Sequence, residues 1–187
     1  MNERIVLASG SPRRKQLLEW AEVDFEVMVS DVAETYPAGL PVGLVPIHIA
    51  RNKAQAVKKQ VAPDRIVLAA DTVVVLDGEI IGKPVDREDA IGILSRLAGQ
   101  QHEVITGVIL SGGGKEIAFA ECTEVNFNEL TRQQIENYVD KYRPYDKAGA
   151  YAIQEWIGVV GIRGIDGDFY NVMGLPVSRV VQELGKW

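Results

Sequence analysis

Cysteine, histidine and long hydrophobic runs are scarce in this chain of 187 residues, and each scarcity excludes a class of protein. The single cysteine, Cys122, rules out an intramolecular disulfide and a cysteine-based zinc site. The two histidines, His48 and His102, stand far apart in the sequence and lack the spacing of metal ligands. No run of about 18 consecutive apolar residues occurs, so we expect no membrane-spanning helix.

Blocks of lysine and arginine are also missing, and the net charge is −6. A general nucleic-acid-binding protein usually carries a basic stripe, so this charge argues against that class. The first residues, "MNERIVLAS", lack the apolar region of a signal peptide, and we expect cytoplasmic residence. Any metal ion is expected to be a hard cation held by carboxylates and phosphate oxygens.

Helical and strand-like patterns mix without strict alternation, which predicts an α/β fold with a mixed sheet and flanking helices. Asp86 and Gly99 bound one helix, and Thr131 with Gln134 forms a capping box. The expected helices are 12–22, about 45–60, 86–99, 131–142 and 175–187, and the expected strands include 4–9, 25–32 and 65–76. Hairpin turns are expected at Asp77-Gly78, at the "SGGG" of 111–114 and at Asp166-Gly167.

The stretch "LASGSPRRKQLLEW" places two arginines in the first turn of a helix, where cations are unfavourable. Ser11 is a good N-cap and Pro12 suits the first helical position. Two explanations stay open for Arg13 and Arg14. Their side chains bend away into water, or they serve an anion together with Ser9 and the free backbone N–H groups of the turn.

Asp71 lies inside the strongly apolar segment "AADTVVV", where a carboxylate is costly without a partner. It either caps a turn at the end of the strand or acts as a metal-holding carboxylate or general base. Thr72 beside it is a plain strand residue or a substrate-facing hydroxyl. Lys53, at the edge of an apolar helical face, and Lys83, in "IGKP", are each expected more often as surface lysines.

The segment "DKAGAYAIQ", residues 146–154, combines small residues with Tyr151 and Gln154. Small residues let a backbone approach a ligand closely, and an amide can read a base edge by paired hydrogen bonds. The alternative is a tightly packed strand.

Five segments occur in the order in which the Maf family of nucleotide pyrophosphatases has them, and the chain resembles that family over nearly its whole length. They are "LASGSPRRKQLL", "AADTVV", "GKP", "DKAGAYAIQ" and "GDFYNVMGLP". The resemblance implies a fold of the Maf/inosine-triphosphatase type, with residues 1–187 as one domain of two lobes around a cleft. It also implies hydrolysis of a nucleoside triphosphate to monophosphate and pyrophosphate, with a divalent cation, Mg²⁺ or Mn²⁺.

The resemblance also assigns roles to residues. "DKAGAYAIQ" is similar to the branch that acts on dTTP and UTP, although Glu155-Trp156 stands where that family often has a glycine after the glutamine. Asp71 is implied as proton acceptor, with Lys53 and Lys83 as further catalytic residues and Glu34 with Asp71 as metal ligands. The implied substrate-binding and specificity residues are Ser9, Arg13, Arg14, Thr72 and Gln154.

A competing hypothesis is a nucleotide-binding regulator of cell division and septum formation, with weak or incidental hydrolysis. The expected partner in either case is a nucleoside triphosphate, with no nucleic acid and no membrane, and a homodimer is a further expectation.

Overall fold

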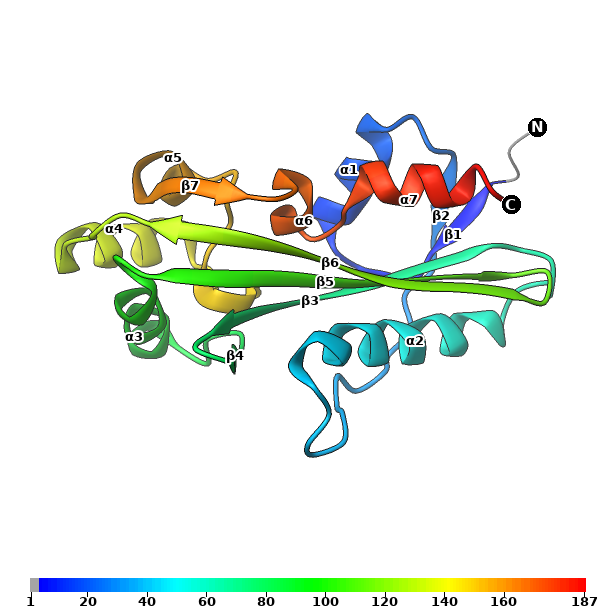
Figure 1. Cartoon of the computed structure of the whole chain (residues 1–187), viewed down its shortest axis with the longest axis horizontal. Helices are drawn as coiled ribbons and strands as arrows, with labels where there is room; N and C mark the ends of the chain where they lie inside the picture. The colour runs from blue at the N-terminus through cyan, green and yellow to red at the C-terminus, as the bar shows by residue number, and fades with distance from the viewer. Residues whose placement is uncertain (1–3) are drawn as a thin grey trace. The chain divides into compact units, whose positions relative to one another are not determined.

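Parallel and antiparallel strands share one sheet in the computed structural model of the chain, which describes residues 4–187 (Figure 1). The seven strands are β1 (Ile5–Leu7), β2 (Phe25–Val27), β3 (Val67–Leu76), β4 (Glu79–Ile81), β5 (Gln101–Gly112), β6 (Lys115–Phe127) and β7 (Ile162–Asp166). Their order is β2-β1-β3-β5-β6-β7, with β4 on β3. β1 pairs in parallel with β2 and β3, whereas the β3–β4 and β6–β7 pairs are antiparallel. The predicted mixed sheet is confirmed.

The helices fall between and after these strands, and the described chain divides into two compact units. The α-helices are α1 (Pro12–Trp20), α2 (Val45–Lys58), α3 (Arg87–Leu97), α4 (Arg132–Tyr142), α5 (Trp156–Gly161), α6 (Phe169–Met173) and α7 (Val177–Leu184), and the 3-10 turns are η1 (Val42–Leu44) and η2 (Ala148–Ala150). The first unit comprises the described residues through Thr72, with Thr106–Glu121 and Gly174–Trp187. The second comprises Val73–Ile105 and Cys122–Met173. The expected cleft between two lobes stays a prediction.

In the first unit, helices cover both faces of the sheet. Figure 1 shows α2 on one face, with α1 and α7 on the opposite face. The apolar stripe of α2, including Ala54 and Val57, packs on Val6 and Val67 of the strands beneath it. A Cβ on Gly107 of β5 would lie 2.3 Å from the backbone nitrogen of Ile47, so only glycine lets α2 start this close to the sheet.

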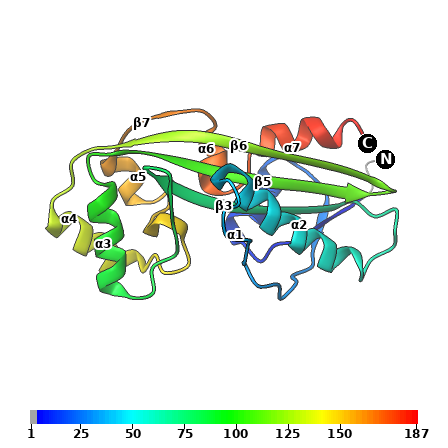
Figure 2. The same cartoon turned by 60° about the horizontal axis from the view of Figure 1, so that its bottom comes forward.

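In the second unit, α3 and α4 lie side by side, as Figure 2 shows. A buried aromatic group packs within the same unit. The His102, Phe127 and Tyr151 rings meet edge to face at centroid distances of 5.0 to 5.5 Å. The His102 Nε2 atom also shares a 2.8 Å hydrogen bond with the Tyr151 hydroxyl. This bond ties β5 to the segment that follows η2.

Local signals in the sequence placed several elements correctly. Asp86 caps α3 by accepting from the Asp89 backbone N–H, and Gly99 follows the helix with a φ of +70°. The capping box at the start of α4 is present with both of its hydrogen bonds. The predicted hairpin in "SGGG" turns at Gly113 and Gly114, which both have positive φ.

Two of the expected elements differ from the structure. The expected strand 25–32 is limited to β2, Phe25–Val27. The hairpin expected at Asp166-Gly167 is wrong, because β7 pairs with β6 and the chain after Gly167 forms α6. The Asp168 carboxylate accepts from the Tyr170 backbone N–H at 2.8 Å, and this bond starts a helix instead of a return strand.

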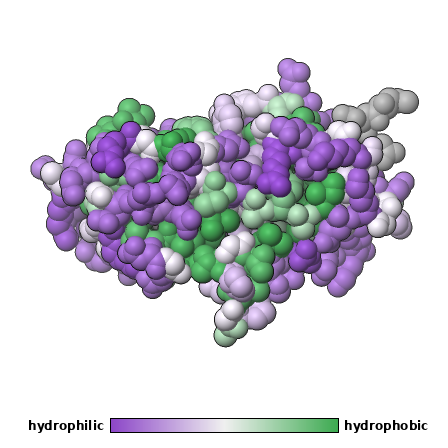
Figure 3. All heavy atoms as spheres, in the orientation of Figure 1, coloured by the Kyte–Doolittle hydropathy of each residue, from purple (hydrophilic) through white to green (hydrophobic). Residues whose placement is uncertain are grey.

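The surface seen in Figure 3 is predominantly hydrophilic, with hydrophobic residues interrupting it. Among residues 4–187, no helix has both the length and the apolar character needed to span a bilayer.

We predict that His102→Gln reduces the acid sensitivity of folding. Burial lowers the pKa of His102 from 6.5 to about 4. The unfolded chain binds a proton at His102 more readily than the folded protein does. The neutral, buried His102 therefore makes its full contribution to folding stability above pH 6.5, and this contribution is lost as pH falls toward 4. The loss is about 3 kcal/mol, and glutamine, which does not titrate, avoids it.

Urea unfolding at several pH values measures this difference, with His48→Gln on α2 as the matched control. If both variants lose stability as steeply as the wild type in this pH range, His102 is not the acid-sensitive group.

Candidate active site

The connection from β1 to α1 forms the turn that the sequence predicted. Ser11 is the N-cap residue of α1, and its hydroxyl accepts from the Arg14 backbone N–H at 3.5 Å. Pro12 occupies the first turn. The Ser9 hydroxyl accepts a 3.3 Å hydrogen bond from the Ser11 backbone N–H. Both arginines therefore lie in the first turn of the helix.

Arg14 is buried, and its guanidinium binds three protein oxygens. Its Nη1 atom donates to the Ser9 hydroxyl at 3.1 Å, and its Nη2 atom donates to the Thr72 hydroxyl at 3.0 Å. Its Nε atom donates to the Gly174 carbonyl at 2.7 Å. The explanation that this side chain bends away into water is wrong, because Arg14 points inward and joins Ser9, β3 and the segment before α7. The explanation that the two arginines serve an anion stays a prediction.

Burial is the main influence on the Arg14 charge and lowers its pKa, while the nearby Asp71 carboxylate opposes that effect. Arg13 adds repulsion that lowers the Arg14 pKa further. Arg13 is half-buried at the same helix start and is close enough to interact electrostatically. Arg14 therefore interacts with a second cation, Arg13, and with the carboxylates of Asp71 and Glu34.

Thr72 is held by more groups than its sequence context suggested. Its hydroxyl lies 2.9 Å from the hydroxyl of Thr106, on β5, and 3.4 Å from the Gly174 carbonyl. Thr106 is fully buried, and sequence reasoning missed it. The only available signal was a threonine inside the apolar strand "HEVITGVIL", which is also an ordinary strand composition.

Asp71 lies in the middle of β3 and not at its end, so the interpretation as a turn cap is wrong. One of its oxygens accepts from the Lys53 ammonium of α2 at 2.7 Å. The same ammonium donates to the Glu34 carboxylate at 2.7 Å. The Lys53 side chain is only 14% exposed, so the surface-lysine interpretation is wrong as well.

Burial raises the pKa of Asp71, against the opposing charges of Lys53 and Arg14. Glu34 contributes a smaller repulsion that acts in the same direction as burial. A carboxyl group with a raised pKa holds a proton more readily when it acts as an acceptor near neutral pH. The environment of Asp71 therefore suits a general base, provided that water and substrate can reach it.

Most of the predicted site residues belong to the first unit, where they form two adjacent groups. Arg14 connects Ser9 with Thr72, and Lys53 connects Glu34 with Asp71. The two groups follow each other directly on β3, through Asp71 and Thr72. Alternation along a strand points these neighbouring side chains to opposite faces.

Lys83 and Gln154, the remaining predicted residues, belong to the second unit. Lys83 is exposed just after β4, and the preceding residue, Gly82, accepts a 3.1 Å backbone hydrogen bond from Gly149. Gln154 is exposed in a turn closed by the Glu155 N–H and the Ala152 carbonyl at 3.1 Å. The segments of both residues are thus joined, and "DKAGAYAIQ" contains the short turn η2 but no strand.

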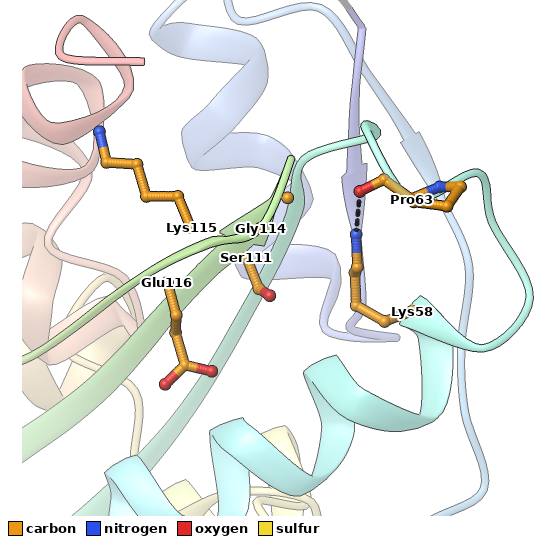
Figure 4. A pocket seen from close by; sticks show the side chains of 7 residues that line it. Lys58, Pro63, Ser111, Gly114, Lys115 and Glu116 are labelled. Atoms are coloured by element: carbon orange, nitrogen blue, oxygen red, sulfur yellow. Dashed lines mark hydrogen bonds between the residues drawn. The ribbon is translucent and has the colours of Figure 1, made fainter.

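A hollow of about 420 Å³ lies elsewhere in the first unit, at the β5–β6 turn (Figure 4). Its charged side chains already have partners. Lys58 donates to the Pro63 and Arg65 carbonyls, Lys115 donates to the Lys186 carbonyl, and Glu116 pairs with Arg51. None of the predicted site residues lines it.

A family comparison supports what this geometry suggests. The model described as "Maf-like protein" matches residues 4–187. The chain belongs to the Maf family.

Named relatives of this Maf protein are similar over almost their whole length. A "dTTP/UTP pyrophosphatase" from Cytophaga hutchinsonii is 49% identical over 99% of this chain and 84% of its own. A "dTTP/UTP pyrophosphatase" from Phocaeicola vulgatus is 47% identical over 98% of this chain and 95% of its own.

Among solved structures, a HAM1 protein from Coxiella burnetii superimposes with a TM-score of 0.56, covering 98% of this chain and 99% of its own at 14% identity. This likeness concerns the fold alone. It agrees with the Maf-type α/β architecture expected from the sequence.

The carboxylates of this Maf protein can hold a divalent cation only with help from other ligands. Within residues 4–187, no group of three His, Cys, Asp or Glu side chains is arranged to hold a metal ion. Asp71 and Glu34 are nevertheless hard oxygen donors that share one ammonium neighbour. Since Mg²⁺ is commonly held by one or two carboxylates and substrate phosphates, this donor pair fits such an ion.

We predict that Asp71→Asn gains stability over the wild type as pH rises. The folded state holds the Asp71 proton more tightly than the unfolded chain does, because burial raises its pKa above 3.8. Proton binding by Asp71 therefore stabilises the folded wild-type protein fully below that value, and this stabilisation is lost as pH rises through the raised pKa. Asparagine does not titrate, so the difference in unfolding free energy should move in favour of the variant as pH rises above about 4.

Denaturant unfolding over that pH range gives the measurement, and Asp140→Asn is the matched control. Hydrogen bonding from Arg87 lowers the pKa of the exposed Asp140, so its contribution is lost as pH falls, with the opposite sign. Parallel curves for the Asp71 variant and the wild type would contradict the assignment.

Proposed function

We propose that this Maf protein hydrolyses dTTP and UTP to the nucleoside monophosphate and pyrophosphate. The observation that carries the proposal is the buried Asp71 carboxylate in mid-strand, paired with Lys53 in a chain whose close relatives are named dTTP/UTP pyrophosphatase. Folding alone gives no reason to keep a carboxylate in an apolar strand.

In this proposal Asp71 accepts the proton of the attacking water. Its raised pKa brings its basicity closer to neutral pH, where a general base works best. Lys53 already donates to the oxygen that would take the proton. An arriving phosphate oxygen competes for that ammonium, and transfer of the Lys53 hydrogen bond to the phosphate would leave the Asp71 oxygen available to water.

The cations of the first unit would neutralise the triphosphate, which carries about four negative charges. Arg13, in the first turn of α1, is proposed to contact phosphate, while Arg14 donates three of its five N–H groups to Ser9, Thr72 and Gly174. Arg14 instead fixes the positions of the Ser9 and Thr72 hydroxyls. Preorganised donors of this kind stabilise charge that develops on the leaving pyrophosphate.

The alternative role for Asp71 is to hold the divalent cation, Mg²⁺ or Mn²⁺, together with Glu34 and substrate phosphates. When bound, such an ion supplies positive charge that stabilises the transferring phosphoryl group.

Two roles are proposed for the second unit. Gln154, exposed in its turn, would recognise the base through its amide, which offers one acceptor and two donor hydrogens. Thymine and uracil share a carbonyl and imide edge that cytosine lacks. Lys83 would supply a further cation. Cytoplasmic residence and a homodimer remain predictions.

The regulatory hypothesis, binding without significant turnover, gains no support from a specific contact. Binding a triphosphate needs the cations but not a buried carboxylate, so Asp71 favours hydrolysis.

We predict that the wild-type protein releases pyrophosphate from dTTP and UTP faster than from CTP, ATP or GTP. The measurement is pyrophosphate release over these five triphosphates with Mg²⁺ or Mn²⁺. The structural reason, which applies to CTP and ATP, is that the Gln154 amide can pair with the carbonyl and imide edge of thymine and uracil, which cytosine and adenine lack. For GTP the expectation rests on the names of the relatives. Equal turnover of purine triphosphates would overturn the base assignment, and no release from any of them would overturn the proposed reaction.

We also predict that Asp71→Asn lowers kcat by about 100-fold or more, as expected for loss of a positioned base. Single-turnover hydrolysis measures the effect, circular dichroism confirms folding, and Asp140→Asn is the control with the same chemical change at an exposed ion pair. Partial recovery in excess Mn²⁺ would assign Asp71 to the cation, and no recovery would assign it to the proton. A folded variant that works at the wild-type rate would remove Asp71 from the mechanism.

A further inference from the structure

The Tyr138 hydroxyl, on α4, makes hydrogen bonds on both sides of Gln154. It accepts from the Ala152 backbone N–H at 3.2 Å and donates to the Glu155 carboxylate. The Tyr138 side chain is only 1% exposed, whereas Gln154 between those two partners is exposed. One buried hydroxyl thus fixes the residues two positions before and one position after the exposed amide.

The turn that presents Gln154 has little freedom apart from these bonds. The Glu155 N–H donates to the Ala152 carbonyl, and Glu155 is the N-cap residue of α5. A Cβ on Gly158 would lie 1.7 Å from the Ile153 carbonyl oxygen, so α5 is in close contact with the turn. Among the described residues, none makes a hydrogen bond to the Gln154 side chain itself. The position from which this side chain extends is therefore set by its backbone.

Charge also holds the Glu155 carboxylate in place. The buried Lys147 ammonium lies 3.7 Å from its second oxygen and 2.8 Å from the Asp146 carboxylate. Burial, followed by the hydrogen bond with Glu155, raises the pKa of Tyr138 well above its usual range. The hydroxyl therefore stays protonated and keeps donating, while its lone pair serves Ala152.

We propose that Tyr138 is a positioning residue for base selection: by holding Ala152 and Glu155 it sets the direction of the Gln154 amide. The inference rests on the proposed function, because it assumes that Gln154 recognises the base. An amide that pairs with a base edge must keep both its position and its plane, so a loosened turn weakens discrimination between bases more than it weakens chemistry. Glu155 and Lys147 serve the same arrangement.

The test compares Tyr138→Phe with Tyr142→Phe. Both changes remove one hydroxyl from α4, and the two rings stack on each other at 4.9 Å. The Tyr142 hydroxyl makes none of the bonds to the Gln154 turn. For Tyr138→Phe we expect the ratio of kcat/KM for dTTP over CTP to fall about fivefold to tenfold, within the range for net loss of an ordinary hydrogen bond. The KM for dTTP should rise, with kcat within about twofold of wild type, because the Asp71–Lys53 pair is untouched.

Amide hydrogen exchange gives a measurement that does not depend on activity. The Ala152 N–H loses its acceptor in Tyr138→Phe, and its exchange should accelerate about fivefold or more, with no change in Tyr142→Phe.

Two further variants keep the test decisive if Tyr138→Phe does not fold. Glu155→Gln retains an acceptor for the Tyr138 hydroxyl and should preserve most of the selectivity, whereas Glu155→Ala should lose it as Tyr138→Phe does. Equal selectivity in both Glu155 variants would overturn the inference.

The failure of this inference can be told apart from failure of the proposed function. A wild-type protein that selects dTTP and UTP, with Tyr138→Phe as selective as Tyr142→Phe, overturns the positioning role and leaves the function standing. A wild-type protein that does not act on dTTP or UTP overturns the function and the inference together.

Discussion

Asp71 is a carboxylate in the middle of a strand whose other residues, apart from Thr72, are apolar, and it needs a cation nearby to remain charged. Lys53 meets that need from α2, and it is shared with Glu34 from the loop before the helix. The packing of α2 on the sheet therefore buries apolar surface and also places the Lys53 ammonium next to Asp71 on β3. Gly107 permits this by letting the start of α2 approach β5 closely.

Arg14, at the start of α1, is a second buried charge that needs partners. A cation at a helix N-terminus is unfavourable, and a buried one more so, yet three of the five Arg14 N–H groups donate to protein oxygens. The result is a fixed arrangement of the Ser9 and Thr72 hydroxyls, with Thr106 supporting Thr72 from β5. Chemistry on a polyanion benefits from groups that need no rearrangement when charge develops.

In the second unit, buried polar groups also find hydrogen-bond partners, and one of these bonds positions a turn. There the buried Tyr138 hydroxyl holds the backbone of the Gln154 turn, and the buried Tyr151 hydroxyl pairs with the His102 side chain. In the sequence, the helix of Tyr138 was notable only for its capping box, and the segment of Tyr151 for its small residues, its tyrosine and its glutamine. Gln154 is exposed and would contact the substrate, whereas Tyr138 is buried and would orient Gln154.

The sequence by itself determined the features that depend on near neighbours: the α3 and α4 caps, the glycine turn between β5 and β6, the α/β class and, through its family motifs, the candidate residues. Local pattern failed at Asp166-Gly167, where pairing with β6 and the Asp168 cap replaced a hairpin, and at Asp71, whose strand continues to Leu76. Only the tertiary structure decided the partners of Arg14, Lys53 and Tyr138. Those bonds join residues up to 160 positions apart, and burial there forces each polar group to find whichever partner the packing of distant segments brings within reach.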